Sequence, residues 1–321
     1  MSAMKPITGT FFEFEHGGEP EGKYYNHVMR AFTEDQWRAQ VRETAEIGMD
    51  TLIILATAMP NPTRAYFPFD EMPYAEKIEC KNALEAVMDE ADKTGQEVYM
   101  AVGMYGTTDT VGNTTDPVII ETALRAMNRL YELYGHHKSF VGWYISDEWC
   151  IWDHFDERFI SYINKISAHA RTLGDNNRVI LAPFGTYCLQ ADDVFAEQLT
   201  RLDCYAIAYQ DEVGVQRMKM EELAWRYEKL AAAHEKAGRS KLWVDMEVFC
   251  FDEGNVYSSA LCPAPWERIA EQLKAHSPYV EKVVIYSYQG LMTKPGSVAR
   301  LGYPERAEQL YTDYVNWLKE Q

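Results

Sequence analysis

The sequence predicts an α/β fold, a closed (β/α)8 barrel that forms a single domain over residues 1–321. Eight apolar stretches are typical of buried strands, and amphipathic or charged stretches separate them in strict alternation. Apolar strands that alternate with helices favour a parallel sheet covered on both faces. Eight such units without a linker between them indicate a closed barrel. An open, doubly wound sheet is the alternative, and the lack of a Gly-x-Gly-x-x-Gly turn after the first strand disfavours it.

The first half of the chain supplies four strand and helix pairs. The predicted strands are residues 7–15, 51–57, 97–103 and 140–149. The predicted helices are residues 33–48, 82–94, 116–134 and 157–173. Thr33 and Gln36 form a capping-box pattern at the start of the first helix. Gly95 ends the second helix, and Pro117 begins the third at a position where its missing N–H costs nothing.

The second half repeats this alternation. The predicted strands are residues 178–183, 203–209, 241–248 and 282–288. The predicted helices are residues 191–202, 219–237, 265–275 and 304–319. Gly238 closes the longest of these helices, as glycine commonly does at a helix C-terminus. The alternation therefore continues to the end of the chain.

The charge balance restricts the classes of partner. The chain has 31 basic and 49 acidic residues, a net charge of −18, which would repel phosphate backbones and anionic lipids. We therefore expect no nucleic-acid partner and no membrane insertion, and no apolar run reaches transmembrane length. Residues 1–7 contain no signal-peptide core, which predicts a cytoplasmic protein, or a periplasmic or secreted one if a leader has been removed.

Two of the predicted strands end in glutamate. Glu148 ends the fourth strand and Glu247 ends the seventh. Active sites of such barrels lie at the carboxyl ends of the strands, so the two side chains would enter one cleft from opposite sides. Two carboxylates that flank a glycosidic bond are the minimum machinery for its hydrolysis. The alternative for each is a buried acid held in an ion pair.

Several local strings carry a family resemblance. They are residues 7–12, 48–54, 141–145 with Glu148, 209–214 with Asp203, and 242–247. They resemble an uncharacterised bacterial family of glycosidase-like barrels, a domain of unknown function related to the clan A glycoside hydrolases. The resemblance implies that Glu148 is the acid/base, that Glu247 is the nucleophile and that the reaction is retaining.

One position departs from the clan pattern. Clan members usually carry Asn immediately before the acid/base, where it bonds the sugar 2-hydroxyl, and this chain has Asp147. A carboxylate accepts a hydroxyl proton but cannot donate as an amide does. If Asp147 and Glu148 were both ionised, their repulsion would raise the pKa of one of the two carboxyls. The retaining outcome therefore stays open.

Other polar and aromatic side chains near strand ends are candidate carbohydrate-binding groups. Polar candidates follow the first, fourth and sixth strands, and Asp245 shares a face of its strand with Glu247. Aromatic rings can stack on sugar faces, although most aromatic residues in a barrel serve packing. The predicted substrate-binding residues are Glu13, Asp147, Trp149, Tyr209, Gln210, Asp211, Asp245 and Tyr288.

Histidines and cysteines show no metal or redox motif. His136 and His137 follow a predicted helix and are interpreted as complements to its C-terminal dipole. The six cysteines include no Cys-x-x-Cys pair, which predicts reduced thiols, with a Cys250–Cys262 disulfide as the less favoured alternative. We therefore expect no metal and no organic cofactor.

The resulting hypothesis is a glycoside hydrolase that acts on a neutral glycan or oligosaccharide. The first alternative is a metal-dependent sugar isomerase or hydrolase, with Glu148, Glu247, Asp211 and a histidine as ligands. The second is a barrel that binds carbohydrate without catalysis. The sequence specifies neither the sugar nor the oligomeric state.

Overall fold

Parallel strands close into a barrel at the centre of the molecule. The structure is a computed structural model that describes residues 4–107, 109–175 and 177–321. Within these ranges eight strands pair in the closed order β1-β12-β9-β8-β7-β6-β5-β2, and each pairing is parallel. The predicted (β/α)8 fold is confirmed. The barrel strands are β1 (Gly9–Phe12), β2 (Thr51–Ile54), β5 (Glu97–Ala101), β6 (Phe140–Ile145), β7 (Arg178–Leu181), β8 (Ala206–Gln210), β9 (Lys241–Glu247) and β12 (Lys282–Tyr286).

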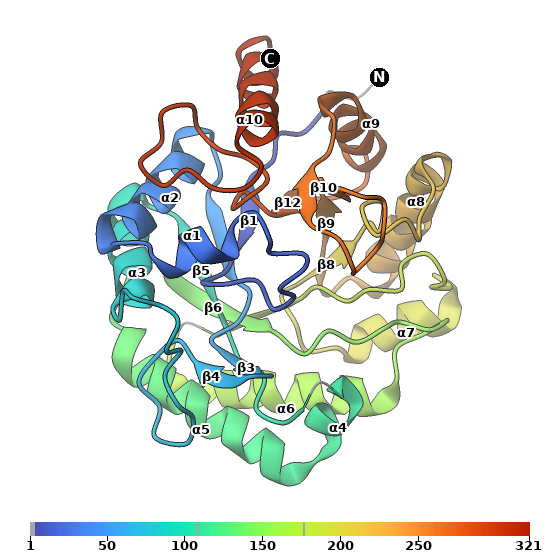
Figure 1. The fold of residues 1–321 in the computed structure, drawn as a ribbon. Coiled ribbons are helices and arrows are strands. Elements are labelled where there is room, and N and C mark those ends of the chain that lie inside the picture. Colours follow the sequence, from blue (N-terminus) through green and yellow to red (C-terminus); the bar gives the residue numbers. More distant parts are fainter. Residues whose placement is uncertain (1–3, 108, 176) are drawn as a thin grey trace.

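Helices form an outer layer around the strands (Figure 1). Gln36 accepts a hydrogen bond from the Thr33 N–H at 2.9 Å, as the capping-box pattern predicts. Gly95 and Gly238 follow their helices with φ of 77° and 61°, a conformation that favours glycine. No helix in the described ranges is both long and apolar enough to cross a bilayer. The outer helices are α2 (Glu34–Glu46), α3 (Ala83–Thr94), α5 (Pro117–Tyr134), α6 (Glu157–Leu173), α7 (Asp193–Arg201), α8 (Met220–Ala237), α9 (Trp266–His276) and α10 (Pro304–Lys319).

Short elements that the sequence pattern did not predict lie in the connecting loops. They are too short to show a hydrophobic period. One hairpin, β10–β11, follows β9 directly, and its Leu261 N–H donates to the Glu21 carbonyl at 3.0 Å. The loop after β1 and the hairpin after β9 are therefore joined. The added elements are α1 (Asn26–Arg30), α4 (Thr110–Thr115), β3 (Ala58–Pro60), β4 (Thr63–Ala65), β10 (Phe249–Phe251) and β11 (Leu261–Pro263).

Aromatic contacts between strands that are not neighbours show which side chains fill the barrel. The rings of Tyr99 in β5 and Trp243 in β9 lie 6.0 Å apart, edge to face. The rings of Phe11 in β1 and Tyr144 in β6 lie 5.3 Å apart. Because side chains alternate along a strand, residues two or four positions further on point the same way. This packed layer therefore directs the side chains at the ends of β6 and β9 toward the barrel axis.

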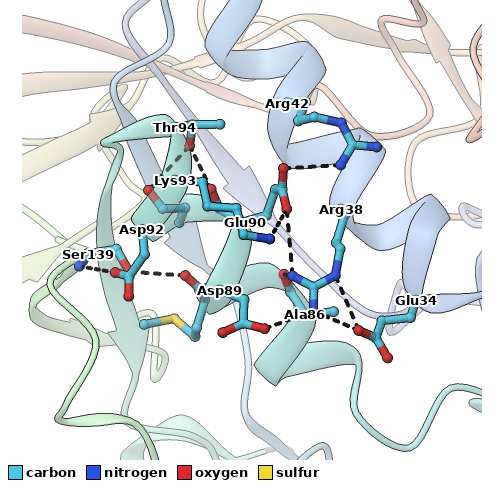
Figure 2. Close-up of polar contacts among 12 residues, drawn as sticks. Glu34, Arg38, Arg42, Ala86, Asp89, Glu90, Asp92, Lys93, Thr94 and Ser139 are labelled. Carbon is cyan, nitrogen blue, oxygen red and sulfur yellow. Dashed lines mark hydrogen bonds and ion pairs between the residues drawn. The ribbon is translucent and has the colours of Figure 1, made fainter.

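Ion pairs connect α2 with α3 on the outside of the barrel (Figure 2). Arg38 Nη2 lies 2.8 Å from Asp89 Oδ2, and Arg42 Nη1 lies 3.1 Å from Glu90 Oε1. Asp89 and Arg42 are substantially exposed, and pairs of this kind contribute little individually. The network therefore links the two helices but adds little to the stability of the fold.

The cysteines remain thiols. Cys250 and Cys262 face each other across β10 and β11, with their Sγ atoms 3.2 Å apart, the distance of a hydrogen bond between thiols and not of a disulfide. The less favoured disulfide is thus not formed in this structure.

Candidate active site

A cavity of about 350 Å³ opens at the carboxyl ends of the barrel strands. Its floor and walls combine carboxyl groups with aromatic and aliphatic side chains. A volume of this size lies within the usual range for small-molecule sites. The lining residues are Phe11, His16, Glu21, Leu55, Glu148, Phe184, Gln210, Glu212, Val215, Arg217, Asp245, Glu247, Phe249, Tyr257, Leu261 and Tyr286.

Glu148 enters the cavity from the loop after β6. Its Oε1 accepts a hydrogen bond from the Tyr144 hydroxyl, and its Oε2 accepts one from Gln210 Nε2, both at 2.9 Å. Burial raises the pKa of Glu148 above its ordinary value, and the bonds from Gln210 and Tyr144 oppose that rise in part. This carboxyl is therefore better able to hold a proton near neutral pH than an exposed glutamate.

Glu247 enters from the end of β9. Its Oε2 accepts a hydrogen bond from the Val215 N–H at 2.8 Å. Its own N–H donates to Asp211 Oδ1 at 3.1 Å, and its carbonyl accepts from Arg268 Nη2 at 2.8 Å. Burial raises the pKa of Glu247 well above its ordinary value, with a further contribution from the charge of Asp211. The position of this carboxyl is thus fixed through both its backbone and its side chain.

Asp245 lies two residues before Glu247 on the same face of β9. It is opposite Gln210 in the register of β8 and β9. Burial raises its pKa well above the ordinary range, and the charges of Glu148 and Glu247 raise it further. Among the described groups none donates a hydrogen bond to its Oδ1. Glu148, Asp245 and Glu247 lie close together, so full ionisation of all three is unfavourable. Asp245 is the group best placed to keep a proton, because no donor stabilises an ionised Oδ1.

A histidine from the loop after β1 carries positive charge at the cavity wall. His16 Nδ1 lies 2.7 Å from the Tyr286 hydroxyl and 3.3 Å from Glu13 Oε1. Burial lowers the pKa of His16, but the charges and hydrogen bonds of Glu13 and Glu21 outweigh burial and raise it to about 10. The imidazole is therefore a cation across the physiological range.

An arginine and its partners also line the cavity. Arg217 Nη1 lies 3.7 Å from Glu212 Oε1, and the guanidinium lies 5.6 Å from the ring centre of Phe184 and 5.9 Å from that of Tyr257. Glu212 Oε2 accepts a hydrogen bond from the Gly185 N–H at 3.1 Å. This part of the lining therefore offers a cation held over aromatic faces.

Four of the predicted site residues line the cavity together. They are Glu148, Gln210, Asp245 and Glu247. Glu13 lies behind the wall, where it is buried and contacts His16 and Tyr286. Its place is therefore that of a support for two lining side chains.

Asp211 also lies behind the wall rather than in it. It is fully buried, and its Oδ2 accepts a hydrogen bond from Gln272 Nε2 at 2.6 Å and lies 3.1 Å from His276 Nε2. Its Oδ1 accepts from the Glu247 N–H. The prediction that it binds substrate is corrected: Asp211 attaches the end of β9 to α9.

Asp147 points away from the cavity. Its Oδ1 accepts from Asn113 Nδ2 and its Oδ2 from the Tyr162 hydroxyl, each at 3.2 Å. Burial raises its pKa to about 6, and these two hydrogen bonds oppose the rise. The expectation that it lies beside the substrate is corrected, because Asp147 lies past the end of β6, where the Glu148 N–H donates to the Ser146 carbonyl at 3.0 Å and the chain turns. The side-chain amide beside Glu148 comes from Gln210.

The three predicted stacking aromatics lie outside the cavity. Tyr209 is fully buried, with its hydroxyl 3.0 Å from His234 Nε2 of α8. Tyr288 is also fully buried and donates to Glu43 Oε2 of α2 at 3.0 Å. Trp149 packs 5.2 Å from the ring of Phe159 in α6. The predictions for Tyr209 and Tyr288 are corrected, since both rings are fully buried against outer helices, whereas the prediction for Trp149 stays untested.

Several lining residues were missed or ranked too low. Glu212 follows the sixth barrel strand closely enough for its position to have indicated it. Tyr286 ends the eighth strand and was recognisable in the same way. Arg217 and Tyr257 come from long loops without a periodic pattern, so only the folded chain brings them to the cavity.

The ligand set of the metal-dependent alternative is not gathered in the described part of the chain. The group of histidine, cysteine and acidic residues with converging ligand atoms lies elsewhere, at Glu85, His136 and His137. Both oxygens of Asp211 accept hydrogen bonds from protein groups. The cavity is therefore an acid-rich site without a converging set of metal ligands among the residues described.

Comparisons with known proteins identify the family and the fold. A family model described as a domain of unknown function, DUF4434, matches residues 7–299. No curated protein matches. The fold is similar to a "putative alpha-L-fucosidase" from Bacteroides thetaiotaomicron VPI-5482, with a TM-score of 0.77, 17% identity and coverage of 100% of this chain and 97% of that one.

Two further solved structures share the fold. An endo-beta-1,4-mannanase from Thermotoga petrophila has a TM-score of 0.64 and 11% identity, covering 98% of this chain and 77% of its own. A glycoside hydrolase family 5 mannosidase from Rhizomucor miehei has a TM-score of 0.57 and 13% identity, covering 98% and 93%. At these identities the likeness shows the barrel fold alone.

Proposed function

Since this chain belongs to the DUF4434 family, a domain of unknown function, we propose from its cavity that it is a glycoside hydrolase acting on a neutral glycan or oligosaccharide. The observation that carries the proposal is that Glu148 and Glu247 line one cavity from β6 and β9. Three strand steps separate these strands on one side of the barrel and five on the other. The two carboxyls thus approach a bound sugar from different sides, as glycoside hydrolysis requires.

Glu148 acts as the general acid. Its raised pKa keeps a proton available for the glycosidic oxygen as the bond to the anomeric carbon breaks. Tyr144 and Gln210 hold its two oxygens in place and stabilise the carboxylate that remains. In the second half of the reaction the same carboxylate takes a proton from the attacking water.

Glu247 acts as the nucleophile. It must be ionised to attack, and its pKa is raised by burial and by Asp211. A proton kept on Asp245 removes one nearby negative charge and so favours ionisation of Glu247. The Val215 N–H stabilises Oε2, while no hydrogen bond reaches Oε1 from the described residues. Oε1 forms the bond to the anomeric carbon, and water later displaces it.

The lining of the cavity supports a neutral substrate. Phe184, Phe249 and Tyr257 present rings on which sugar faces can stack. Glu247 is ionised in the reactive state, and its negative charge in the cavity disfavours an anionic sugar. His16 and Arg217 are each paired with an acid, so their charges are largely compensated.

A second candidate is a barrel that binds carbohydrate without hydrolysing it. The raised pKa of Glu247 favours this reading, because a carboxyl that stays protonated cannot act as a nucleophile. The two candidates differ in turnover and not in affinity. A single experiment that measures both sugar binding and turnover separates them.

The test is a screen of the purified protein against aryl glycosides and oligosaccharides, followed by two variants. Glu148→Gln should lower kcat/KM about 10²- to 10⁴-fold for poor leaving groups and much less for dinitrophenyl glycosides, which need no proton. Glu247→Gln should abolish turnover with both. Glu121→Gln, a change at an exposed glutamate of α5, is the matched control.

Near-wild-type turnover in either active-site variant would refute the assignment. Binding of a sugar, seen by calorimetry, without turnover of any substrate would favour the second candidate. Azide rescue of a Glu247→Ala variant distinguishes a missing nucleophile from a damaged fold. Its glycosyl azide product should have the anomeric configuration opposite to that of the substrate.

A further inference from the structure

A cluster of two histidines and a glutamate lies on the outer wall of the barrel. Glu85 is in the first turn of α3, and His136 and His137 lie between α5 and β6. Each residue offers a ligand atom, and these atoms all lie within 4.8 Å of one another. The segment with the histidines leads into the start of β6, whereas Glu148 follows its end. The cluster is therefore separate from the cavity.

The side chain of His137 is held in a single orientation. It is 4% exposed, and its Nδ1 lies 3.0 Å from Asp92 Oδ2. Asp92 Oδ1 in turn accepts the Ser139 N–H at 2.7 Å, a contact visible in Figure 2. Because a carboxylate accepts hydrogen bonds, Nδ1 donates to Asp92, and Nε2, which lies nearest Glu85, is the ring nitrogen left for a ligand.

The ring nitrogen Nε2 of His137 has no hydrogen-bond partner among the described groups. Leaving a buried polar atom unpaired costs about 1–3 kcal/mol, so such an atom calls for an explanation. Glu85 Oε1 lies 3.5 Å from it, too long for a good hydrogen bond. In a tetrahedral zinc site with bonds of about 2.0–2.1 Å, ligand atoms lie roughly 3.3–3.4 Å apart.

The neighbouring histidine completes the set. His136 is exposed, and its ring centre lies 4.2 Å from that of His137. Two imidazoles and a carboxylate are ligands that suit zinc, with water in the fourth position. A ligating histidine whose other nitrogen is held by a carboxylate is a recurrent feature of such sites, and Asp92 supplies that carboxylate.

We propose that Glu85, His136 and His137 form a binding site for a divalent zinc-type cation. The site would connect α3 to the segment that precedes β6. It explains the unpaired Nε2 of His137 and the position of Asp92 behind the ring. Because it lies on the outer wall, the bound ion stabilises the fold and takes no part in the cavity.

The experiment uses the full-length protein after chelator treatment and dialysis, titrated with zinc chloride by calorimetry. We expect one zinc per chain with a Kd in the micromolar range or below, and a higher Tm with zinc than without. His136→Ala and Glu85→Gln change accessible side chains and should each weaken zinc binding at least tenfold. His27→Ala removes an exposed histidine on α1 and should bind zinc as the wild type does.

A further variant tests the role of the supporting carboxylate. Asp92→Asn should weaken zinc binding about 10–100-fold, as loss of such a partner typically does. A wild-type Kd in the millimolar range would overturn the proposal, and so would unchanged zinc binding in both His136→Ala and Glu85→Gln. The readout is metal affinity, so the result does not depend on any activity of the cavity.

Discussion

Removal of the Gln210 amide should raise the pKa of Glu148 and move the alkaline limb of the pH–rate profile upward. Gln210 Nε2 donates to Glu148 Oε2 at 2.9 Å, and this bond stabilises the ionised carboxylate. Gln210→Met keeps the length of the side chain and removes the donor. A hydrogen bond to a charged group contributes about 1.5–3 kcal/mol, and 1.36 kcal/mol corresponds to one pKa unit. The pKa of Glu148 should therefore rise by roughly one to two units.

The direction in which the alkaline limb moves follows from the proposed role of Glu148 as the general acid. Activity requires its protonated form, so kcat/KM falls as pH rises through the pKa of this carboxyl. In Gln210→Met the fall should begin at higher pH, measured with an aryl glycoside that has a poor leaving group. Tyr144→Phe removes the other donor and should shift the limb in the same direction. Tyr209→Phe, whose hydroxyl contacts α8, is the control. An alkaline limb that stays in place in both test variants would refute the role of Glu148.

Two further predictions concern stability. The pKa of Asp245 is raised by burial and by the charges of Glu148 and Glu247, so the folded state keeps a proton that the unfolded chain releases. Asp245 should therefore contribute a fall in the stability of the wild type as pH rises above the ordinary aspartate pKa, and this single group contributes at most about 1.4 kcal/mol per pH unit. In the Asp245→Asn variant the free energy of unfolding, measured in urea between pH 5 and 8, should fall less steeply with pH than in the wild type. Parallel plots of this free energy against pH for the two proteins would contradict the prediction. Tyr288→Phe removes the hydrogen bond to Glu43 and should lower the free energy of unfolding by about 1–3 kcal/mol without changing kcat/KM. A loss of kcat/KM without a loss of stability would instead indicate that Tyr288 binds the substrate.

The barrel was predictable because each of its strands and helices is specified by residues within that segment or next to it. Each strand is a short apolar run, and each helix has a capping or stop signal next to it, as at Thr33 and Gly238. Only one arrangement of eight such pairs covers every apolar face without open edges. The short hairpins and α4 were missed because a few residues cannot show a period.

The presence of two glutamates in one cavity was predictable for a related reason. A strand has a period of two, and a barrel puts its site at the carboxyl ends, so Glu148 and Glu247 could be placed by counting. Counting does not extend to Asp147, because the strand ends at Ile145 and the chain then turns, so only the folded structure shows the contact of Asp147 with Tyr162. The predictions for Tyr209 and Tyr288 failed because residue type was given more weight than direction.

The sequence by itself determined the fold class, the order of the strands along the chain and the two glutamates at the ends of the fourth and seventh. The tertiary structure decided which neighbours each carboxyl has. Gln210 beside Glu148, Asp245 near both glutamates and Arg217 in the cavity lining come from segments far apart in the chain. Burial and charge proximity set the pKa values, and both are properties of the folded chain. Asp92 behind His137 is a contact of the same kind, because α3 reaches that loop only in the closed barrel.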